Sequence, residues 1–304
     1  MDNIILIFLC LIAGIALQRV KAFPANSYVA LNQYIIHIAL PAMALYYIPK
    51  VAISSRLLFP LGIAWGGFLL SWVLFASLGR FYGWSKKLTG CLILTGGLGN
   101  TSFVGFPIIE ALFGKEGLKT AIIVDQPGTF AVMATLGIIV AVTYSGGAVG
   151  TAGIVRRIVF FPPFAAVAIG MLINVSGYDF HDVLQPVLQR LGNTVTPVAL
   201  IAVGMQLKIQ RRNKHWGFLG LGLFYKLFLM PAIFFVLYKI IMRGKGMEID
   251  VAVVEAAMAP MITACILASS HGLKPRLAGM MLGIGIPLSL LTVGLWYWLV
   301  RLCS

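Results

Sequence analysis

Apolar stretches long enough to cross a bilayer run through almost the whole chain, and they restrict its fold more than any other feature. A helix needs about 17 to 25 mostly apolar residues to span the hydrocarbon core. We identify ten such stretches, at residues 3–18, 28–48, 57–79, 88–113, 121–144, 158–175, 183–207, 218–241, 251–269 and 277–300. The connections between them are short, so the chain has no segment for a nucleotide-binding domain or a sensor kinase.

The composition supports this interpretation and excludes other classes of protein. Hydrophobic residues make up 60% of the chain and charged residues 11%, whereas a soluble domain carries about 25% charged residues. Disorder requires low hydrophobicity, and a disulfide scaffold requires more than the four cysteines present. The sequence therefore predicts an all-α, multi-pass membrane protein.

The distribution of basic residues predicts an orientation in the membrane. The chain has 23 Lys and Arg against 9 Asp and Glu, but they occur between apolar stretches and form no basic stripe with aromatics, so we expect no nucleic-acid partner. Arg19 and Lys21 follow the first apolar stretch, unlike the basic start of a signal peptide. With the N-terminus outside, thirteen Lys and Arg lie inside and eight, among them Lys239, lie outside. Both termini are therefore predicted to lie outside.

Two of the stretches carry residues that interrupt a membrane helix. The fourth contains glycines, polar side chains and Pro107, and the ninth contains Pro260. Proline lacks an N–H group and clashes with the preceding turn, so we expect each helix to break near its proline. Each freed backbone group costs several kcal/mol in hydrocarbon, so such a break persists only inside protein or beside a water-filled cavity.

The positions of the prolines indicate an internal repeat. Pro41 and Pro197 lie 156 residues apart, and Pro107 and Pro260 lie 153 apart. Five spans per copy would give the copies opposite orientations, as in many secondary transporters. We predict a first five-helix repeat at residues 1–145, a short cytoplasmic connector at 146–157 and a second, inverted repeat at 158–304. Chance spacing of the prolines is the alternative.

These motifs together resemble the auxin efflux carrier family, which includes the PIN-type carriers of plants. The resemblance covers essentially the whole chain and is carried by IALPA at 38–42, GNTSFVGFP at 99–107, LGNTVTP at 191–197, KLFLMP at 226–231 and AAMAP at 256–260. It implies ten helices in two inverted repeats, broken helices four and nine that cross, and transport of small organic anions. The short segment between spans five and six resembles bacterial members, and this implies the bacterial inner membrane, a plasma membrane, as the location.

Ionisable residues inside the spans are expensive to bury and are therefore functional candidates. Lys226 is expected near the membrane centre as a cationic partner for substrate or for a carboxylate; snorkelling of its ammonium group to the interface is the alternative. Asp125, Glu255 and Glu110 are predicted to lie in the outer half, where a buried carboxylate can handle protons. Structural ion pairs are the alternative for these three acids.

The proposed substrate site lies at the two breaks. Free N–H groups at helix N-termini attract anions, and side chains there can bind a ligand or satisfy unwound backbone. The site residues are Asn100, Thr101, Ser102, Pro107, Pro260, Thr263 and Lys226. No residues have metal-ligand spacing, and the glycines at 97 and 99 do not follow a strand, so neither a metal nor a cofactor is expected.

Three other interpretations remain open. A sodium-coupled anion symporter would bind Na⁺ through carbonyls and hydroxyls at the breaks. An intramembrane enzyme would need a nucleophile with its base or a metal-binding group, and the sequence offers none at suitable spacing. A structural or receptor-like membrane protein would not require costly breaks in matched positions. Helices one and six could face lipid or form a homodimer.

Overall fold

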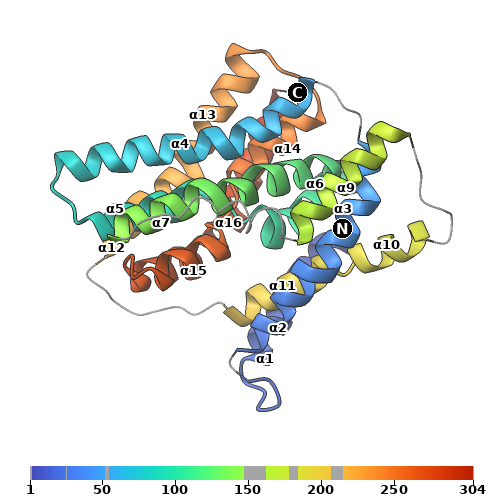
Figure 1. Cartoon of the computed structure of the whole chain (residues 1–304), viewed down its shortest axis with the longest axis horizontal. Helices are drawn as coiled ribbons and strands as arrows, with labels where there is room; N and C mark the ends of the chain where they lie inside the picture. Colours follow the sequence, from blue (N-terminus) through green and yellow to red (C-terminus); the bar gives the residue numbers. More distant parts are fainter. Residues whose placement is uncertain are drawn as a thin grey trace.

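The computed structural model describes residues 2–24, 26–51, 55–146, 162–177, 184–206 and 215–303, which form helices and one isolated antiparallel bridge (Figure 1). The predicted connector at 146–157 lies outside these residues except for Gly146. The α-helices of the first half are α1 Asp2–Leu17, α2 Ser27–Tyr34, α3 Leu40–Tyr47, α4 Leu58–Phe81, α5 Lys86–Gly97, α6 Phe106–Ile123 and α7 Ile138–Ser145. Those of the second half are α9 Pro162–Ser176, α10 Leu184–Gly192, α11 Val195–Gln206, α12 Trp216–Phe224, α13 Met230–Phe235, α14 Met247–Ala256, α15 Ile262–Ser270 and α16 Pro275–Leu302.

Several α-helices continue directly into wider π-helical segments. These are η1 Ile35–Ala39, η4 Thr101–Gly105, η5 Val124–Phe130, η6 Met133–Gly137, η7 Tyr225–Leu229 and η8 Val236–Ile241; η2 Ile48–Lys50 and η3 Ser55–Leu57 are short 3₁₀ helices. Pro41, Pro107 and Pro231 each lie two residues after the end of a π-helical segment. A wider turn moves the preceding carbonyl away from the proline ring, so these helices continue through their prolines.

Five helical segments of the described residues are long and apolar enough to cross a membrane: Ser27–Lys50, Leu58–Phe81, Thr101–Ser145, Trp216–Ile241 and Pro275–Leu302. The chain turns at Gly114 within the third of these, because its φ of 70° is left-handed. Large apolar side chains such as Leu172 and Leu291 point outward, as they would toward lipid. An all-helical, multi-pass membrane protein therefore agrees with the structure, whereas ten spans in an inverted repeat stay a prediction.

The two predicted breaks lie side by side. The backbone leaves helical geometry at residues 98–100, between α5 and η4, and at 257–261, between α14 and α15. Asn100 N donates to the Ala259 carbonyl at 2.7 Å, and Met261 N donates to the Leu98 carbonyl at 2.9 Å. These bonds form an antiparallel bridge between Gly99 and Pro260. The expectation of a break near Pro107 was wrong, because the π-helical segment η4 accommodates that proline seven residues after the break.

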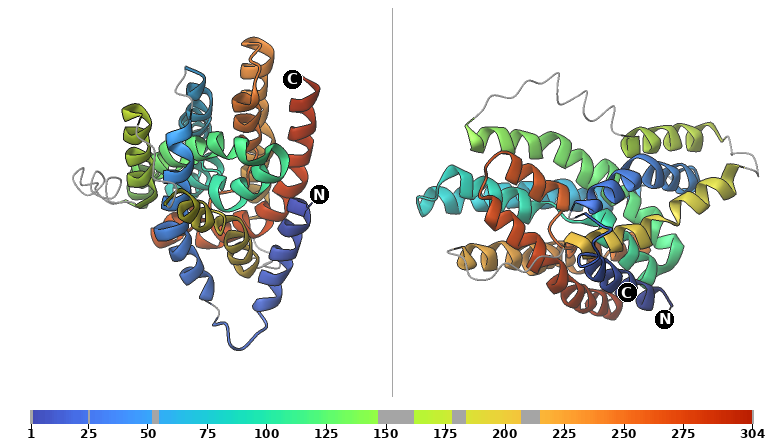
Figure 2. Two further views of the ribbon diagram at one scale, coloured as in Figure 1. Left: turned by 90° about the vertical axis from the view of Figure 1, so that its right-hand side faces the viewer. Right: turned by 90° about the horizontal axis from the view of Figure 1, so that it is seen from below.

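The helices of the two halves pack against each other around these breaks. In both views of Figure 2 the orange and red helices α14, α15 and α16 lie against the green helices of the first half, in agreement with the contacts of α14 with α6 and of α15 with α5. At one side of this core, α1 packs along α11. Their backbones approach closely at Gly14 and Gly204, where a Cβ on Gly204 would lie 2.4 Å from the Leu11 carbonyl oxygen.

A buried ion pair joins η8 and α14 away from the breaks. Lys239 Nζ in η8 lies 2.8 Å from Asp250 Oδ1 in α14, and both side chains are almost fully buried. Lys239, which the basic-residue count places on the outer side, is thus a buried helical residue with an acidic partner. The basic-residue count could not have shown this, because Lys239 lies at the end of an apolar stretch and its partner is eleven residues away.

We expect Asp250→Asn to destabilise the protein by about 3–5 kcal/mol, because it leaves the ammonium group of Lys239 buried without its counter-charge. The matched control is Glu116→Gln, which breaks the exposed pair with Lys119 and should cost at most about 1 kcal/mol. Thermal unfolding in one detergent measures both. Equal melting temperatures for the two variants would contradict a stabilising role for the buried pair.

Candidate functional site

Asn100 occupies the end of the first break and is 1% exposed. Its side-chain Oδ1 accepts a hydrogen bond from Phe103 N at 3.2 Å and so caps the start of η4. Its Nδ2 is buried and has no hydrogen-bond partner among the described residues. The amide therefore stabilises the helix start with one atom and leaves a buried donor available with the other.

Thr101 and Asp125 connect the first break to the following helix. Thr101 Oγ1 donates to Asp125 Oδ1 at 2.6 Å, and the neighbouring Gln126 Nε2 donates to Asp125 Oδ2 at 2.5 Å. Asp125 is 2% exposed. Gln126 Oε1 is buried without a hydrogen-bond partner in the described part of the chain. One carboxylate thus receives two side-chain donors from η4 and η5.

Lys226 reaches the second break from η7. Its Nζ donates to the Ala256 carbonyl at 2.8 Å and lies 3.5 Å from Met230 Sδ. A Cβ on Gly99 would lie 3.0 Å from this nitrogen, so the ammonium group lies beside both breaks. Lys226 is 1% exposed, and its nitrogen is directed into the protein rather than toward an interface.

Glu255 lies next to Ala256 at the end of α14 and is 1% exposed. Both of its carboxyl oxygens are buried and lack a hydrogen-bond partner within the described ranges. The carboxyl group rests against Gly105 of η4, where a Cβ would lie 2.5 Å from Oε2. Only glycine leaves room for this carboxyl group, because any side chain at position 105 would displace it.

A cavity of about 40 Å³ adjoins the breaks. Its polar lining residues are Ser102, Asp125, Gln126 and Thr263, and its apolar ones are Ile36, Leu40, Phe103, Phe130 and Met261. A second cavity of about 380 Å³ shares Phe130 and Thr263 with the first and is otherwise lined mostly by apolar side chains of η6, α7 and α15. The larger, mostly apolar cavity therefore lies next to the small polar one.

The two helices that start after the breaks differ in how their first N–H groups are satisfied. Asn100 caps η4 with its side chain. The cap residue of α15 is Met261, which offers no side-chain hydrogen bond. Thr263 in the first turn of α15 is half-buried and lines both cavities. The start of α15 therefore presents the freer set of N–H groups.

The structure brings together most, but not all, of the residues singled out in the sequence. Asn100, Thr101, Asp125, Lys226, Glu255 and Pro260 surround the breaks, with Ser102 and Thr263 at the cavity. Pro107 lies within α6, away from the bridge itself. Glu110 is half-buried and accepts a hydrogen bond from Thr196 Oγ1 at 3.0 Å in α11. Glu110 therefore contacts a different helix from the other two acids.

Sequence reasoning missed Gln126 and Gly105. Gln126 follows Asp125 directly, and a polar pair before Pro127 inside an apolar stretch was a usable signal. Gly105 had no such signal, because its importance comes from the carboxyl group of a residue 150 positions away.

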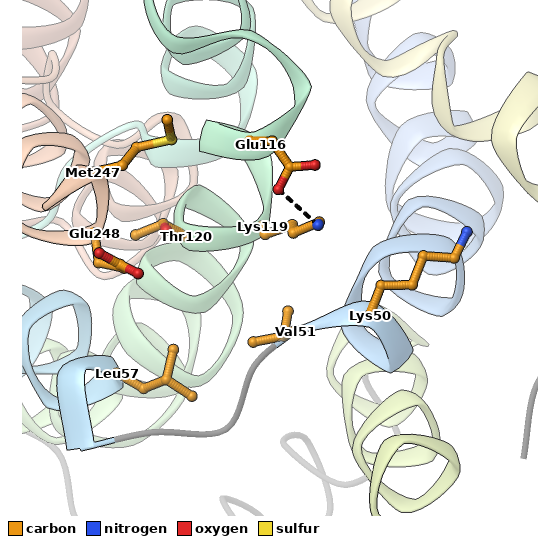
Figure 3. Close-up of a pocket in the computed structure, with 8 residues that line it drawn as sticks. All are labelled: Lys50, Val51, Leu57, Glu116, Lys119, Thr120, Met247 and Glu248. Carbon is orange, nitrogen blue, oxygen red and sulfur yellow. Dashed lines mark hydrogen bonds and ion pairs between the residues drawn. The ribbon is translucent and has the colours of Figure 1, made fainter. Parts of the chain in front are cut away.

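A third cavity of about 340 Å³ shares no lining residue with the two that adjoin the breaks (Figure 3). Glu116 and Lys119, on adjacent turns of α6, pair with each other at 2.7 Å. Lys50 points away from them in Figure 3, toward Gln185 Oε1 and the ring of Tyr46. The charged side chains of Glu116, Lys119 and Lys50, which line this cavity, thus already have partners.

A helical membrane protein whose two broken helices meet at a buried polar centre belongs structurally with membrane transporters. Comparison with known families agrees: the model of the membrane transport protein family matches residues 1–297. The chain belongs to this family, which confirms its resemblance to the auxin efflux carriers.

Two similar proteins come from archaea. An uncharacterized transporter of Methanocaldococcus jannaschii is 26% identical over 309 residues, which cover 99% of this chain and 98% of that protein. An uncharacterized transporter of Methanothermobacter thermautotrophicus is 25% identical over 305 residues, with 97% and 96% covered. Both relatives thus match along almost their whole length and are named as transporters.

We expect Gly105→Ala to displace the carboxyl group of Glu255 and so to destabilise the protein, because the added Cβ would lie 2.5 Å from Glu255 Oε2. The matched control is Gly137→Ala, also in a π-helical segment, where the nearest atom would lie 3.6 Å away. The apparent melting temperature of purified protein should fall in Gly105→Ala and stay at or above the wild-type value in Gly137→Ala. A Gly105→Ala protein as stable as the control would show that the carboxyl group is not confined by this glycine.

Proposed function

We propose that this protein is a secondary active transporter that moves a small organic anion, a carboxylate, across the plasma membrane by alternating access at the crossing of its broken helices. The observation that carries the proposal is the backbone bridge between Gly99 and Pro260 beside the buried ammonium group of Lys226. A buried cation and an unsatisfied donor at the bridge are suited to an anion. The membership of the family supports transport as such.

Recognition of the anion would use donors from both broken helices. Asn100 Nδ2 has no partner within the described residues, and Thr263 lies in the first turn of α15, whose N-terminus lacks a side-chain cap. A carboxylate bound there gains from the helix dipole and from the free N–H groups. Lys226 would supply the counter-charge, with Thr101, Ser102, Pro107 and Pro260 shaping the site.

Alternating access would follow from the predicted inverted repeat. Two five-helix halves of opposite orientation would open the crossing to one side of the membrane and then to the other. The cavities that adjoin the centre share Phe130 and Thr263, so these side chains would line one of the two routes. Both halves supply groups to the centre: Asn100 and Asp125 come from the first, Lys226 and Glu255 from the second.

A cation transported with the anion would balance the negative charge of the buried acids at the crossing. Proton coupling would use Asp125, Glu255 or Glu110. Sodium coupling is the alternative, and the unpartnered Gln126 Oε1 beside the cavity favours it, since sodium prefers oxygen ligands.

Counterflow in proteoliposomes tests the transport proposal directly. Vesicles loaded with one member of a panel of dicarboxylates, monocarboxylates and indole acids are diluted into the same acid carrying a label. We expect saturable accumulation of at least one acid, and its reduction by at least about tenfold in Asn100→Ala, because one lost hydrogen bond to a charged group costs about 1.5–3 kcal/mol. The control is Asn26→Ala, an exposed asparagine. No exchange of any acid by folded protein would reject organic-anion transport.

The coupling ion is tested with the acid that counterflow identifies. We expect uptake to rise when the outside is made acidic and to stay unchanged when sodium is replaced by choline, because the carboxylates of the centre take up the proton. Uptake that requires sodium at constant pH would instead establish the symporter alternative. A collapsed pH gradient, imposed with an ionophore, is the control for both conditions.

A further inference from the structure

The carboxyl group of Glu255 is the least satisfied polar group of the centre. Neither oxygen has a hydrogen-bond partner within the described residues, and Glu255 is only 1% exposed. An ionised carboxylate without a single donor is very costly to hold inside a protein, whereas a neutral carboxyl group is far less so. The surroundings of Glu255 therefore suit its neutral form.

Asp125 has the opposite surroundings at similar burial. Thr101 Oγ1 and Gln126 Nε2 donate to its two oxygens. Donors to both oxygens stabilise a carboxylate and leave less reason for it to hold a proton. The two buried acids of the crossing are thus distinguished by geometry alone.

The charges around Glu255 lead to the same assignment. Lys226 on η7, which bonds the Ala256 carbonyl next to Glu255, and Asp125 on η5, which bonds Thr101 of η4, are the other buried charged groups at the breaks. On the other elements packed against α14, Glu110 of α6 bonds Thr196 and Arg301 of α16 lies in the last turn, while Asp250 of α14 itself pairs with Lys239. With Lys226 positive and Asp125 negative, the centre is neutral only when Glu255 carries a proton.

We propose that Glu255 is the proton-carrying residue of the crossing and that Lys226 is its alternative partner. In the conformation described here Glu255 holds the proton and Lys226 Nζ donates to the Ala256 carbonyl, one residue along the chain. When Glu255 loses its proton, it becomes a carboxylate. Lys226 Nζ then stops donating to the Ala256 carbonyl and donates to this carboxylate instead. The proton passes to water on the side of the membrane to which the crossing is open.

This exchange would act on the break itself. The Ala256 carbonyl ends α14 immediately before the non-helical residues 257–261. When Lys226 leaves it, the second break loses the donor that satisfies its first carbonyl, and the ammonium group also leaves Gly99 of the first break. Proton release would thereby loosen both broken helices together. This coupling role rests on the proposed transport function, whereas the position of the proton does not.

Infrared spectroscopy of the purified full-length protein tests the position of the proton without any substrate. Exposed Asp and Glu side chains are almost fully deprotonated above a pH of about 5, so a band of protonated carboxyl at pH 7 reports a buried group. We expect such a band in the wild type, its loss in Glu255→Gln and its retention in Asp125→Asn, the matched buried acid. A band retained in Glu255→Gln, or lost only in Asp125→Asn, would overturn the assignment.

Two further variants make the test independent of how well Glu255→Gln folds. In Lys226→Met the band should persist to a pH about one to three units higher, because the opposing cation is gone. In Gly105→Ala the band should change in frequency, because the added Cβ would press on Oε2, and in Gly137→Ala it should not. Unchanged titration in Lys226→Met would refute Lys226 as the partner. Failure of counterflow with the band as expected would reject the transport proposal alone.

Discussion

The backbone hydrogen bonds between the two breaks are the interaction on which the rest of the centre depends. Asn100 N–H reaches the Ala259 carbonyl, and Met261 N–H reaches the Leu98 carbonyl. In hydrocarbon, unwound backbone has no water to bond, so each break would cost several kcal/mol per freed group if it stood alone. Each broken helix supplies hydrogen-bond partners for the unwound backbone of the other. The bridge fixes the helix ends that carry Asn100 and Glu255, and Lys226 reaches the second break from η7 through its bond to the Ala256 carbonyl.

Charge balance is the second constraint on the same volume. Lys226, Asp125 and Glu255 are each at most 2% exposed, and charges at such sites require partners. Asp125 receives two donors and Lys226 receives a carbonyl, but Glu255 receives no bond in the described structure. The second buried cation of the same half, Lys239, has an acid at 2.8 Å. Lys239 thus has an ionic partner, whereas the buried acid Glu255 at the crossing has no hydrogen-bond partner among the described residues.

Sequence patterns predicted the helical class, both broken helices and the polar residues at them, because hydropathy and proline act locally. These patterns failed where a residue distant in the chain determines the local structure or the contacts of a side chain. Pro107 was expected to break its helix, yet a π-helical turn absorbs it. Lys226 allowed two positions until its contact with Ala256 was known. Lys239 gave no sign of its ion pair because Asp250 lies beyond a turn, and Gly105 gave no sign of its role because Glu255 is 150 residues away.

The two helices that start at the crossing differ in their capping, and this difference makes the two sides of the crossing inequivalent. Asn100 covers the first N–H groups of η4 with its own side chain, so an anion that bound there would have to displace it. The start of α15 has no such cap, and Thr263 opens from it to both adjoining cavities. Under the proposed function, an anion would therefore meet the start of α15 first and the unpartnered Nδ2 donor of Asn100 second. A binding step in that order would draw the first break toward the second from one side only, which is the asymmetry that a transport cycle needs.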